Sequence, residues 1–313
     1  MKISVLMSVY NEVFLQVEMA VDSILNQTMG DFEFIIVNDN PDSKEMRKIL
    51  DNIRVKDDRI VVINNEKNIG LAMSLNRAAK VAKGDVFARM DADDVSDINR
   101  FEKEYGLIKS GKYDLITTSF HFIDDNSDYV DGNVAYYDEK MVTELLPYGN
   151  TIHHPTTMMT REIFEKVGGY RDFPCAQDYD LWLRMYENGA RMYMMEEDLF
   201  AYRIRSQSIT GSKRIRQIAT MRYMRKLYRE RKKYGKDSYS PDNYKNYLEK
   251  KKMIKNGEKM YRLYNEGREI KKEGVGKKIV YYAKIVITCP FLTGMYLEKV
   301  KFVLMRRKLK GAD

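Results

Sequence analysis

Apolar and polar positions follow two different patterns along the first 110 residues of the chain, one typical of strands and one typical of helices. Short runs rich in Val, Ile and Phe are typical of buried strands, and they lie at residues 3–9, 32–38, 60–64 and 86–90. Between these runs, apolar residues at helical spacing predict helices over residues 13–27, 43–51 and 71–81. Strands separated by helices of this length predict an α/β fold with a mainly parallel sheet, whose ligands bind outside the carboxyl ends of the strands.

The pattern is less regular between residues 111 and 211, where it predicts strands over residues 115–122 and 192–202 and helices over residues 139–146, 161–167 and 179–187. From residue 212 onward, helical stretches rich in Lys, Arg, Tyr and Met cover residues 215–234 and 244–272. The apolar run 285–297 is shorter than the ~20 residues of a membrane span and contains Pro290, so it suits a helix in a membrane interface. These changes divide the chain into residues 1–110, 111–211 and 212–313.

Charge follows the same division. The chain has 313 residues and a formal net charge of +8. Residues 212–313 hold 30 Lys and Arg against 10 Asp and Glu, whereas residues 1–211 hold 24 against 36. An acidic body with a basic tail argues against one continuous nucleic-acid-binding surface, and we expect no nucleic-acid partner.

Other global features predict a cytoplasmic protein. Two cysteines are too few for a disulfide framework or a four-thiolate zinc site, and they favour a reducing compartment. The first residues read as a strand without a small-residue cleavage site, so we expect no signal peptide.

Aspartates follow two of the predicted strands. Asp91, Asp93 and Asp94 come directly after residues 86–90, where carboxylates at alternate positions can converge on one hard cation while phosphate oxygens complete its shell. The alternative is an acidic cluster that starts the next helix. Asp39 ends the strand 32–38 and suits either a nucleoside-binding acid or an Asx-turn. A dinucleotide site is excluded, because residues 9–12 lack the glycines that it requires after the first strand.

Seven short segments together resemble a known family. They are SVLMSVYNE at residues 4–12, VND at 37–39, NIGLA at 68–72, DADD at 91–94, HP at 154–155, GGY at 168–170 and DYDLWLR at 178–184. In this order they resemble the family 2 glycosyltransferases of GT-A fold, most of all those that build bacterial capsule, exopolysaccharide and O-antigen chains. The resemblance covers residues 1–211 and does not extend to the basic tail.

The resemblance implies a Rossmann-like, mixed and mainly parallel sheet flanked by helices. Residues 1–110 would bind a nucleotide-sugar, and residues 111–211 would bind the acceptor and carry the catalytic base. Asp39 would bond the base of the nucleotide, commonly uracil. Three further residues would line the same pocket, namely Tyr10, Glu12 and Asn68.

The resemblance also implies a D-x-D pair made of Asp91 and Asp93. This pair would hold the ribose and a Mg²⁺ or Mn²⁺ on the diphosphate, where a cation stabilises the charge of the departing nucleotide. Asp94 would instead support the loop or cap the next helix.

Asp178 matches the general base of this family, which inverts the anomeric configuration of the sugar. Its carboxylate would take the proton of the acceptor hydroxyl as the new bond forms. The acid that usually precedes this base is Gln177 here, and the alternative role of Asp178 is to cap the helix 179–187.

Two further residues belong to the implied site. The resemblance implies that His154 lines the acceptor or diphosphate site. A zinc site is not expected, because two adjacent His residues without a third ligand nearby do not have zinc spacing. Arg205 stands where the family often has His, so it would pair with the diphosphate in place of a metal ligand, or lie exposed on a loop.

Four roles are open for residues 212–313. Their Lys and Arg clusters would bind anionic headgroups at the inner face of the cell membrane, at about 1 kcal/mol per basic residue. The alternatives are a surface for a helical partner, an RNA-binding surface without a recognisable motif, and solvated helices without a partner.

The sequence therefore predicts a metal-dependent inverting glycosyltransferase that is peripheral on the inner face of the cell membrane. It would move a sugar from a nucleotide-sugar, by expectation a UDP-sugar, to a glycan or lipid-linked acceptor of surface-polysaccharide synthesis. One alternative is a sugar-1-phosphate nucleotidyltransferase, which would need a Gly-rich basic loop after the first strand. The other is a membrane scaffold with an inactive GT-A domain.

Overall fold

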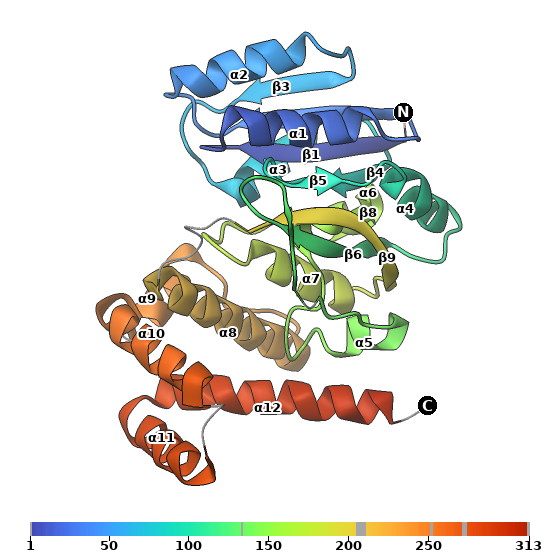
Figure 1. Cartoon of the computed structure of the whole chain (residues 1–313). Helices are drawn as coiled ribbons and strands as arrows, with labels where there is room; N and C mark the ends of the chain where they lie inside the picture. Colours follow the sequence, from blue (N-terminus) through green and yellow to red (C-terminus); the bar gives the residue numbers. More distant parts are fainter. Residues whose placement is uncertain (1, 133, 205–210, 251–252, 271–273, 312–313) are drawn as a thin grey trace. The chain divides into compact units, whose positions relative to one another are not determined.

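The chain forms two compact units (Figure 1). The computed structural model describes residues 2–132, 134–204, 211–250, 253–270 and 274–311. The first unit comprises Met1–Glu144 and Thr151–Ser206, and the second comprises Leu145–Asn150 and Gln207–Asp313. Arg205 lies outside the described residues, so its predicted role stays a prediction.

The first unit is built on a sheet in the order β3-β2-β1-β4-β8-β6-β9-β5, with β7 paired to β6. The strands β1 to β4 are parallel where they pair, and β6 is parallel to β9, whereas β8 is antiparallel to both of its neighbours. The mixed, mainly parallel sheet predicted from the sequence is therefore confirmed. The strand bounds are β1 Ile3–Val9, β2 Phe32–Asn38, β3 Ile60–Asn64, β4 Val86–Arg89, β5 Val95–Ser96, β6 Leu115–Ile123, β7 Tyr129–Val130, β8 Met158–Thr160 and β9 Met192–Arg203.

Helices connect these strands. The predicted bounds of three strands and of the helix 71–81 are the same in the structure, and the other predicted ends differ by a few residues. The strands β5 and β7 were not predicted, because two residues are too short for an alternating pattern to emerge. The helix bounds are α1 Phe14–Leu25, α2 Lys44–Arg54, α3 Leu71–Val81, α4 Arg100–Lys109, α5 Glu139–Glu144, the 3₁₀-helix η1 His154–Thr156, α6 Arg161–Lys166 and α7 Gln177–Glu187.

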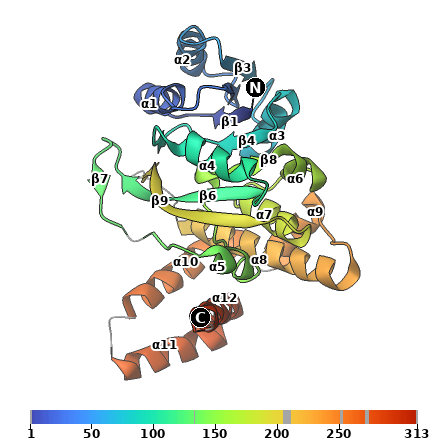
Figure 2. The same cartoon turned by 90° about the vertical axis from the view of Figure 1, so that its right-hand side faces the viewer.

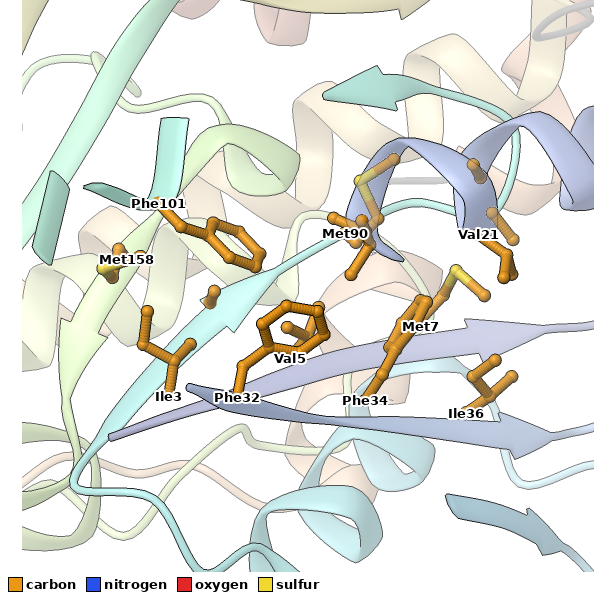
Figure 3. Close-up of a cluster of buried hydrophobic side chains, with 14 of the residues drawn as sticks. Ile3, Val5, Met7, Val21, Phe32, Phe34, Ile36, Met90, Phe101 and Met158 are labelled. Carbon is orange, nitrogen blue, oxygen red and sulfur yellow. The ribbon is translucent and has the colours of Figure 1, made fainter. Parts of the chain in front are cut away.

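Both faces of the sheet are covered, so β1 and β2 are buried along almost their whole length. On one face, Val5, Met7 and Phe34 belong to a buried cluster that also contains residues of α1, α2 and α4 (Figure 3). On the other face, Phe87 of β4 packs edge-on against Phe164 of α6, with ring centroids 5.3 Å apart. Alternate residues of a strand point to opposite faces, so burial on both sides fixes the register of the central strands.

The second unit is helical and can be followed in Figure 2. Its buried positions on α8 recur every four residues, at Ile215, Ala219, Tyr223 and Leu227, so one stripe of the helix faces the interior. The hydroxyls of Thr220 and Tyr244 lie 2.6 Å apart and join α8 to α9. The helices are α8 Gly211–Tyr234, α9 Pro241–Lys250, α10 Met253–Glu269, α11 Val275–Thr288 and α12 Pro290–Lys310.

One prediction for the second unit was wrong. The apolar run 285–297 does not form a single interfacial helix, because α11 ends at Thr288 and α12 begins at Pro290. Proline lacks a backbone N–H and fits the first position of a helix better than its interior. The predicted helix 244–272 corresponds to α9 and α10, which lie on either side of residues 251–252, outside the described part. Within the described residues, we find no helix with the length and apolar character of a membrane span.

Candidate active site

Hydrogen bonds connect the loops that follow the first three strands of the sheet. The parallel register places Val9 beside Asn38, and Asn38 beside Asn64. Beyond these pairs, the side chain of Asn38 donates to the Asn64 side chain at 2.9 Å. Asn40 donates through its Nδ2 to the carbonyl of Tyr10 at 2.7 Å. The three strand ends therefore form one connected edge.

Asp39 holds the next loop in place. Its buried carboxylate accepts hydrogen bonds from Asn65 Nδ2 at 2.7 Å, from the Ile69 N–H at 2.8 Å and from the Gly70 N–H at 2.9 Å. Gly70 precedes α3 and has a φ of +81°, a conformation that favours glycine. The Asx-turn at this place is made by Asn38, whose Oδ1 accepts the Asn40 N–H at 3.0 Å. The Asp39 carboxylate thus binds the segment 65–70, and the Asx-turn is formed by Asn38 instead.

Tyr10, Glu12 and Asn68 lie on the loops of this edge. Glu12 accepts the backbone N–H of Tyr10 at 2.7 Å, and the Tyr10 side chain is 46% exposed. Asn68 is exposed, and its Oδ1 accepts the Gly70 N–H at 3.2 Å. Asn68 also lines a cleft of about 780 Å³, which is bounded by residues 67–73, 172–175 and 177. The cleft therefore lies where α3 and α7 begin, and helix N-termini favour anionic groups.

The acidic loop 91–94 alternates between interior and surface. Ala92 and Asp94 are buried, whereas Asp91 and Asp93 are half-buried. Asp94 accepts the Arg203 N–H at 2.8 Å, and burial raises the pKa of its carboxyl well above the usual range, with Asp91 and Asp93 adding to the effect. Arg203 also donates through Nε to the carbonyl of Asp93 at 2.6 Å. Asp94 and Arg203 therefore support the loop and leave Asp91 and Asp93 on its outer side.

Two buried arginines fix the strand that leads into this loop. Arg89 is 2% exposed, forms an ion pair with Asp91, and donates through Nη1 to the carbonyl of Leu6 at 3.1 Å. Arg100 donates to the carbonyl of Arg89 at 2.8 Å and pairs with Glu104, which is also fully buried. Buried charges need such partners, because an isolated charge in the interior is strongly unfavourable.

Asp178 lies within electrostatic range of the acidic loop. Burial raises the pKa of the Tyr170 hydroxyl, and the carboxylates of Asp178 and Asp91 act in the same direction. The pKa of Tyr202 is raised by desolvation and by four carboxylates, those of Asp91, Asp94, Asp93 and Asp178. The carboxylates of Asp178 and of the acidic loop therefore both raise the pKa of these two hydroxyls, although Asp178 lies 84 residues or more from the loop along the chain.

The start of α7 separates the roles of its two aspartates. The helix begins at Gln177, after Ala176 with a φ of +56°, so Asp178 lies in the first turn and is not the N-cap. Asp180 is fully buried and forms an ion pair with Arg184 at 2.8 Å, and Arg184 donates to the carbonyl of Gly169 at 2.7 Å. Asp180 therefore anchors α7, whereas Asp178 remains half-buried.

His154 faces an aromatic neighbourhood. Its Nε2 lies 2.7 Å from the Tyr170 hydroxyl, and its ring packs edge-on against Tyr170 and Trp182. Burial lowers the pKa of His154 well below its usual value, and the positive charge of Arg89 lowers it further. A neutral His154 joined to Tyr170 can orient that hydroxyl near Asp178.

Three residues of this site were missed in the sequence. Arg89 had a visible signal, because a charged residue inside an apolar strand needs a buried partner. Asn65 follows the strand β3 and holds Asp39, but a single Asn after a strand is common in loops. Tyr202 is one of 23 tyrosines and had no pattern to distinguish it.

The depressed pKa of His154 predicts sensitivity to acid. In the unfolded chain His154 takes up a proton as the pH falls below its ordinary value, whereas in the folded protein it stays neutral, so acid favours unfolding. Between about pH 7 and about pH 5 this effect removes roughly 2 kcal/mol from the free energy of unfolding. In His154→Gln we expect the loss over this interval, measured by urea unfolding, to be smaller by about that amount. An identical loss in both proteins would contradict the assignment.

Comparisons with known proteins identify the family of the chain. The family model "Glycosyl transferase family 2" matches residues 4–168. An uncharacterized glycosyltransferase of Methanocaldococcus jannaschii is 34% identical over 204 residues, which cover 64% of this chain and 70% of that protein. The O-antigen biosynthesis glycosyltransferase WbnJ of Escherichia coli is 34% identical over 199 residues, which cover 63% of this chain and 77% of that protein.

Solved structures show the same fold. The structure of S. aureus TarS 1-349 in complex with UDP has a TM-score of 0.57 at 16% identity, covering 82% of this chain and 71% of that one. At this identity the likeness is one of fold alone. Because the family model matches more than half of the sequence, and the relatives that it resembles are glycosyltransferases, the chain belongs to glycosyl transferase family 2 and is an enzyme of GT-A fold.

Proposed function

We propose that this glycosyltransferase moves a sugar from a UDP-sugar to a hydroxyl of a surface-polysaccharide intermediate, with inversion at the anomeric carbon. The observation that carries the proposal is that four carboxylates either follow parallel strands of the sheet or lie at the start of α7. They are Asp39, Asp91, Asp93 and Asp178. In a parallel α/β sheet, ligands bind at the carboxyl ends of the strands.

The donor site is proposed for the loops after β1, β2 and β3. Asp39 would accept a hydrogen bond from the uracil ring, since its carboxylate is held at a fixed place by Asn65 and Gly70. Tyr10 and Asn68 are exposed at the same loops and would contact the nucleoside, while Glu12 supports the Tyr10 backbone. A structural neighbour, S. aureus TarS, has been solved with UDP and with UDP-GlcNAc.

The residues present fit a divalent cation that arrives together with the diphosphate. In the described part of the chain, no three His, Cys, Asp or Glu side chains are placed to hold a metal ion by themselves. Asp91 and Asp93 offer hard carboxylate oxygens of the kind that Mg²⁺ and Mn²⁺ prefer, and phosphate oxygens would complete the shell. When bound, the cation would stabilise negative charge on the leaving diphosphate. The Asp91 carboxylate also pairs with Arg89, which holds it in position before any ligand binds.

Asp178 is the proposed general base. The acceptor hydroxyl oxygen would form a bond to the anomeric carbon while the bond from that carbon to the diphosphate oxygen breaks, and the hydroxyl proton would pass to the Asp178 carboxylate. The hydrogen bond between His154 and Tyr170 would orient the Tyr170 hydroxyl toward the acceptor region. The nucleotidyltransferase alternative is not favoured, because the chain matches glycosyltransferases and lacks a Gly-rich loop after β1.

The acceptor is proposed to be lipid-linked, and the basic second unit is proposed to bind the inner face of the cell membrane. One E. coli relative, 28% identical over 204 residues (60% of this chain and 69% of that protein), is named UDP-Gal:alpha-D-GlcNAc-diphosphoundecaprenol beta-1,3-galactosyltransferase. The 30 Lys and Arg residues of positions 212–313 would attract anionic lipids to the enzyme, at about 1 kcal/mol for each residue near the surface.

Replacing the proposed base tests the mechanism. Asp178→Asn keeps the size of the side chain but cannot take the acceptor proton, so we expect turnover to fall by about a hundredfold or more with UDP affinity unchanged. The assay measures UDP release from a panel of UDP-sugars with a GlcNAc-diphospholipid acceptor, and UDP affinity is measured by calorimetry. Asp58→Asn, at an exposed turn before β3, is the matched control and should retain full turnover. Undiminished turnover in Asp178→Asn would refute its role as the base.

Replacing Asp93 tests the metal site. In Asp93→Ala we expect the affinity for UDP in the presence of Mn²⁺ to fall at least about tenfold, equivalent to ~1.4 kcal/mol, because one carboxylate ligand is lost. Affinity in the absence of Mn²⁺ should change little. Calorimetric titration with and without Mn²⁺ separates the two effects, with Asp58→Ala as the control. Equal titration heats for Asp93→Ala and the unmodified protein in Mn²⁺ would show that Asp93 is not a ligand.

A further inference from the structure

The helix α11 has apolar side chains on two sides, and only one of these sides is buried. Its inward side chains, Tyr281 and Ile285, are one helical turn apart, and the Tyr281 hydroxyl donates to the carbonyl of Leu263 on α10 at 2.6 Å. On the opposite side, five aliphatic residues are between 59% and 81% exposed. They are Val275, Ile279, Val280, Val286 and Ile287.

A groove continues this apolar surface into the second unit. It has a volume of about 670 Å³ and lies among α8, α10, α11 and α12. Val286 of α11 belongs both to the exposed face and to the groove lining. From α12, Leu297, Val300 and Leu304 line it at helical spacing, and all three are more than half exposed. The exposed face of α11 and this groove together are called the α11–α12 surface below.

Basic residues surround the α11–α12 surface. Between positions 275 and 310 the sequence has nine Lys and Arg residues and a single acid, Glu298. Glu298 is engaged by Arg222 at 3.1 Å and by Arg225 at 2.6 Å, so its charge is already neutralised within the unit. On α11, Lys277 and Lys284 follow the edge of the apolar face at a spacing of seven residues, which is two helical turns.

We propose that the α11–α12 surface binds an anionic phospholipid bilayer, with α11 lying in the headgroup region and the groove receiving a hydrocarbon chain. Exposed aliphatic side chains would enter the acyl boundary while the flanking Lys and Arg residues reach the lipid phosphates. This inference rests on the proposed membrane association of the second unit and names the surface responsible, but it does not depend on the proposed sugar transfer.

Charge favours a bilayer over a second copy of the chain as the occupant. Two copies of the α11–α12 surface facing each other would bring like charges together, which disfavours association. An anionic bilayer supplies both the negative charge and the apolar phase that this surface lacks.

Vesicle sedimentation with the full chain tests the proposal. Binding is compared between vesicles of equal parts phosphatidylcholine and phosphatidylglycerol and vesicles of phosphatidylcholine alone. We expect the unmodified protein to bind the anionic vesicles and the double variant Val280→Gln, Ile287→Gln to bind them at least tenfold more weakly. Both side chains are mostly exposed, so we expect the variant to fold, and its circular dichroism spectrum is compared with that of the unmodified protein. Val55→Gln is the matched control, because Val55 is 83% exposed but lies in the first unit.

A second pair of variants tests the charge. Lys277→Gln with Lys284→Gln should weaken binding to the anionic vesicles, whereas Lys48→Gln with Lys109→Gln, in the first unit, should not. Val300→Gln, in the groove, should weaken binding without any change in charge. Equal losses in the first-unit controls would overturn the proposal.

The outcomes separate this inference from the proposals on which it rests. If the unmodified protein binds no anionic vesicles, both the membrane association and the α11–α12 surface are refuted, while UDP release in the presence of a soluble acceptor still tests transfer. If the unmodified protein and the α11 double variant bind equally, another surface holds the membrane and this inference falls. If the double variant instead converts a dimer to a monomer in sedimentation velocity without affecting vesicle binding, the occupant is a second copy.

Discussion

The parallel pairing of β1 with β2 on one side and β4 on the other is the constraint on which the candidate site depends. It places Val9 beside Asn38 and Leu6 beside Arg89, so the chain leaves all three strands at the same edge of the sheet. This pairing is maintained because both faces of the strands are buried, and a slip by one residue would exchange the two sets of side chains. The chemistry at the edge is therefore a consequence of the packing in the core.

Buried polar groups then hold the loops in fixed positions relative to these strands. Arg89 and Arg100 hold the carbonyls of β1 and β4 and pair with Asp91 and Glu104. The carboxylate of Asp39 holds the segment 65–70 in place by accepting three hydrogen bonds from it. Because each buried charge would be costly alone, the loops are fixed relative to the strands before any ligand arrives.

Much of the first unit could be predicted from the sequence, because its signal is local. The strands 3–9, 32–38 and 60–64 are short runs rich in Val, Ile and Phe, and such runs are recognisable without knowledge of the fold. The positions of Arg89 and Tyr202 in the site could not be predicted, because they depend on contacts between segments far apart in the chain. In the tail, the apolar residues 285–297 suggested one helix, but Pro290 divides them between α11 and α12, and the exposed face of α11 begins earlier, at Val275.

The two units divide the proposed work between an acidic body and a basic tail. The central claim concerns the first unit, that its strand-end carboxylates bind a nucleotide diphosphate and a divalent cation. A crystal structure of the protein with UDP and Mn²⁺ tests this most directly. The account predicts the uracil ring against Asp39 and the diphosphate with its metal ion against Asp91 and Asp93. Well-defined UDP bound away from these three residues would contradict it.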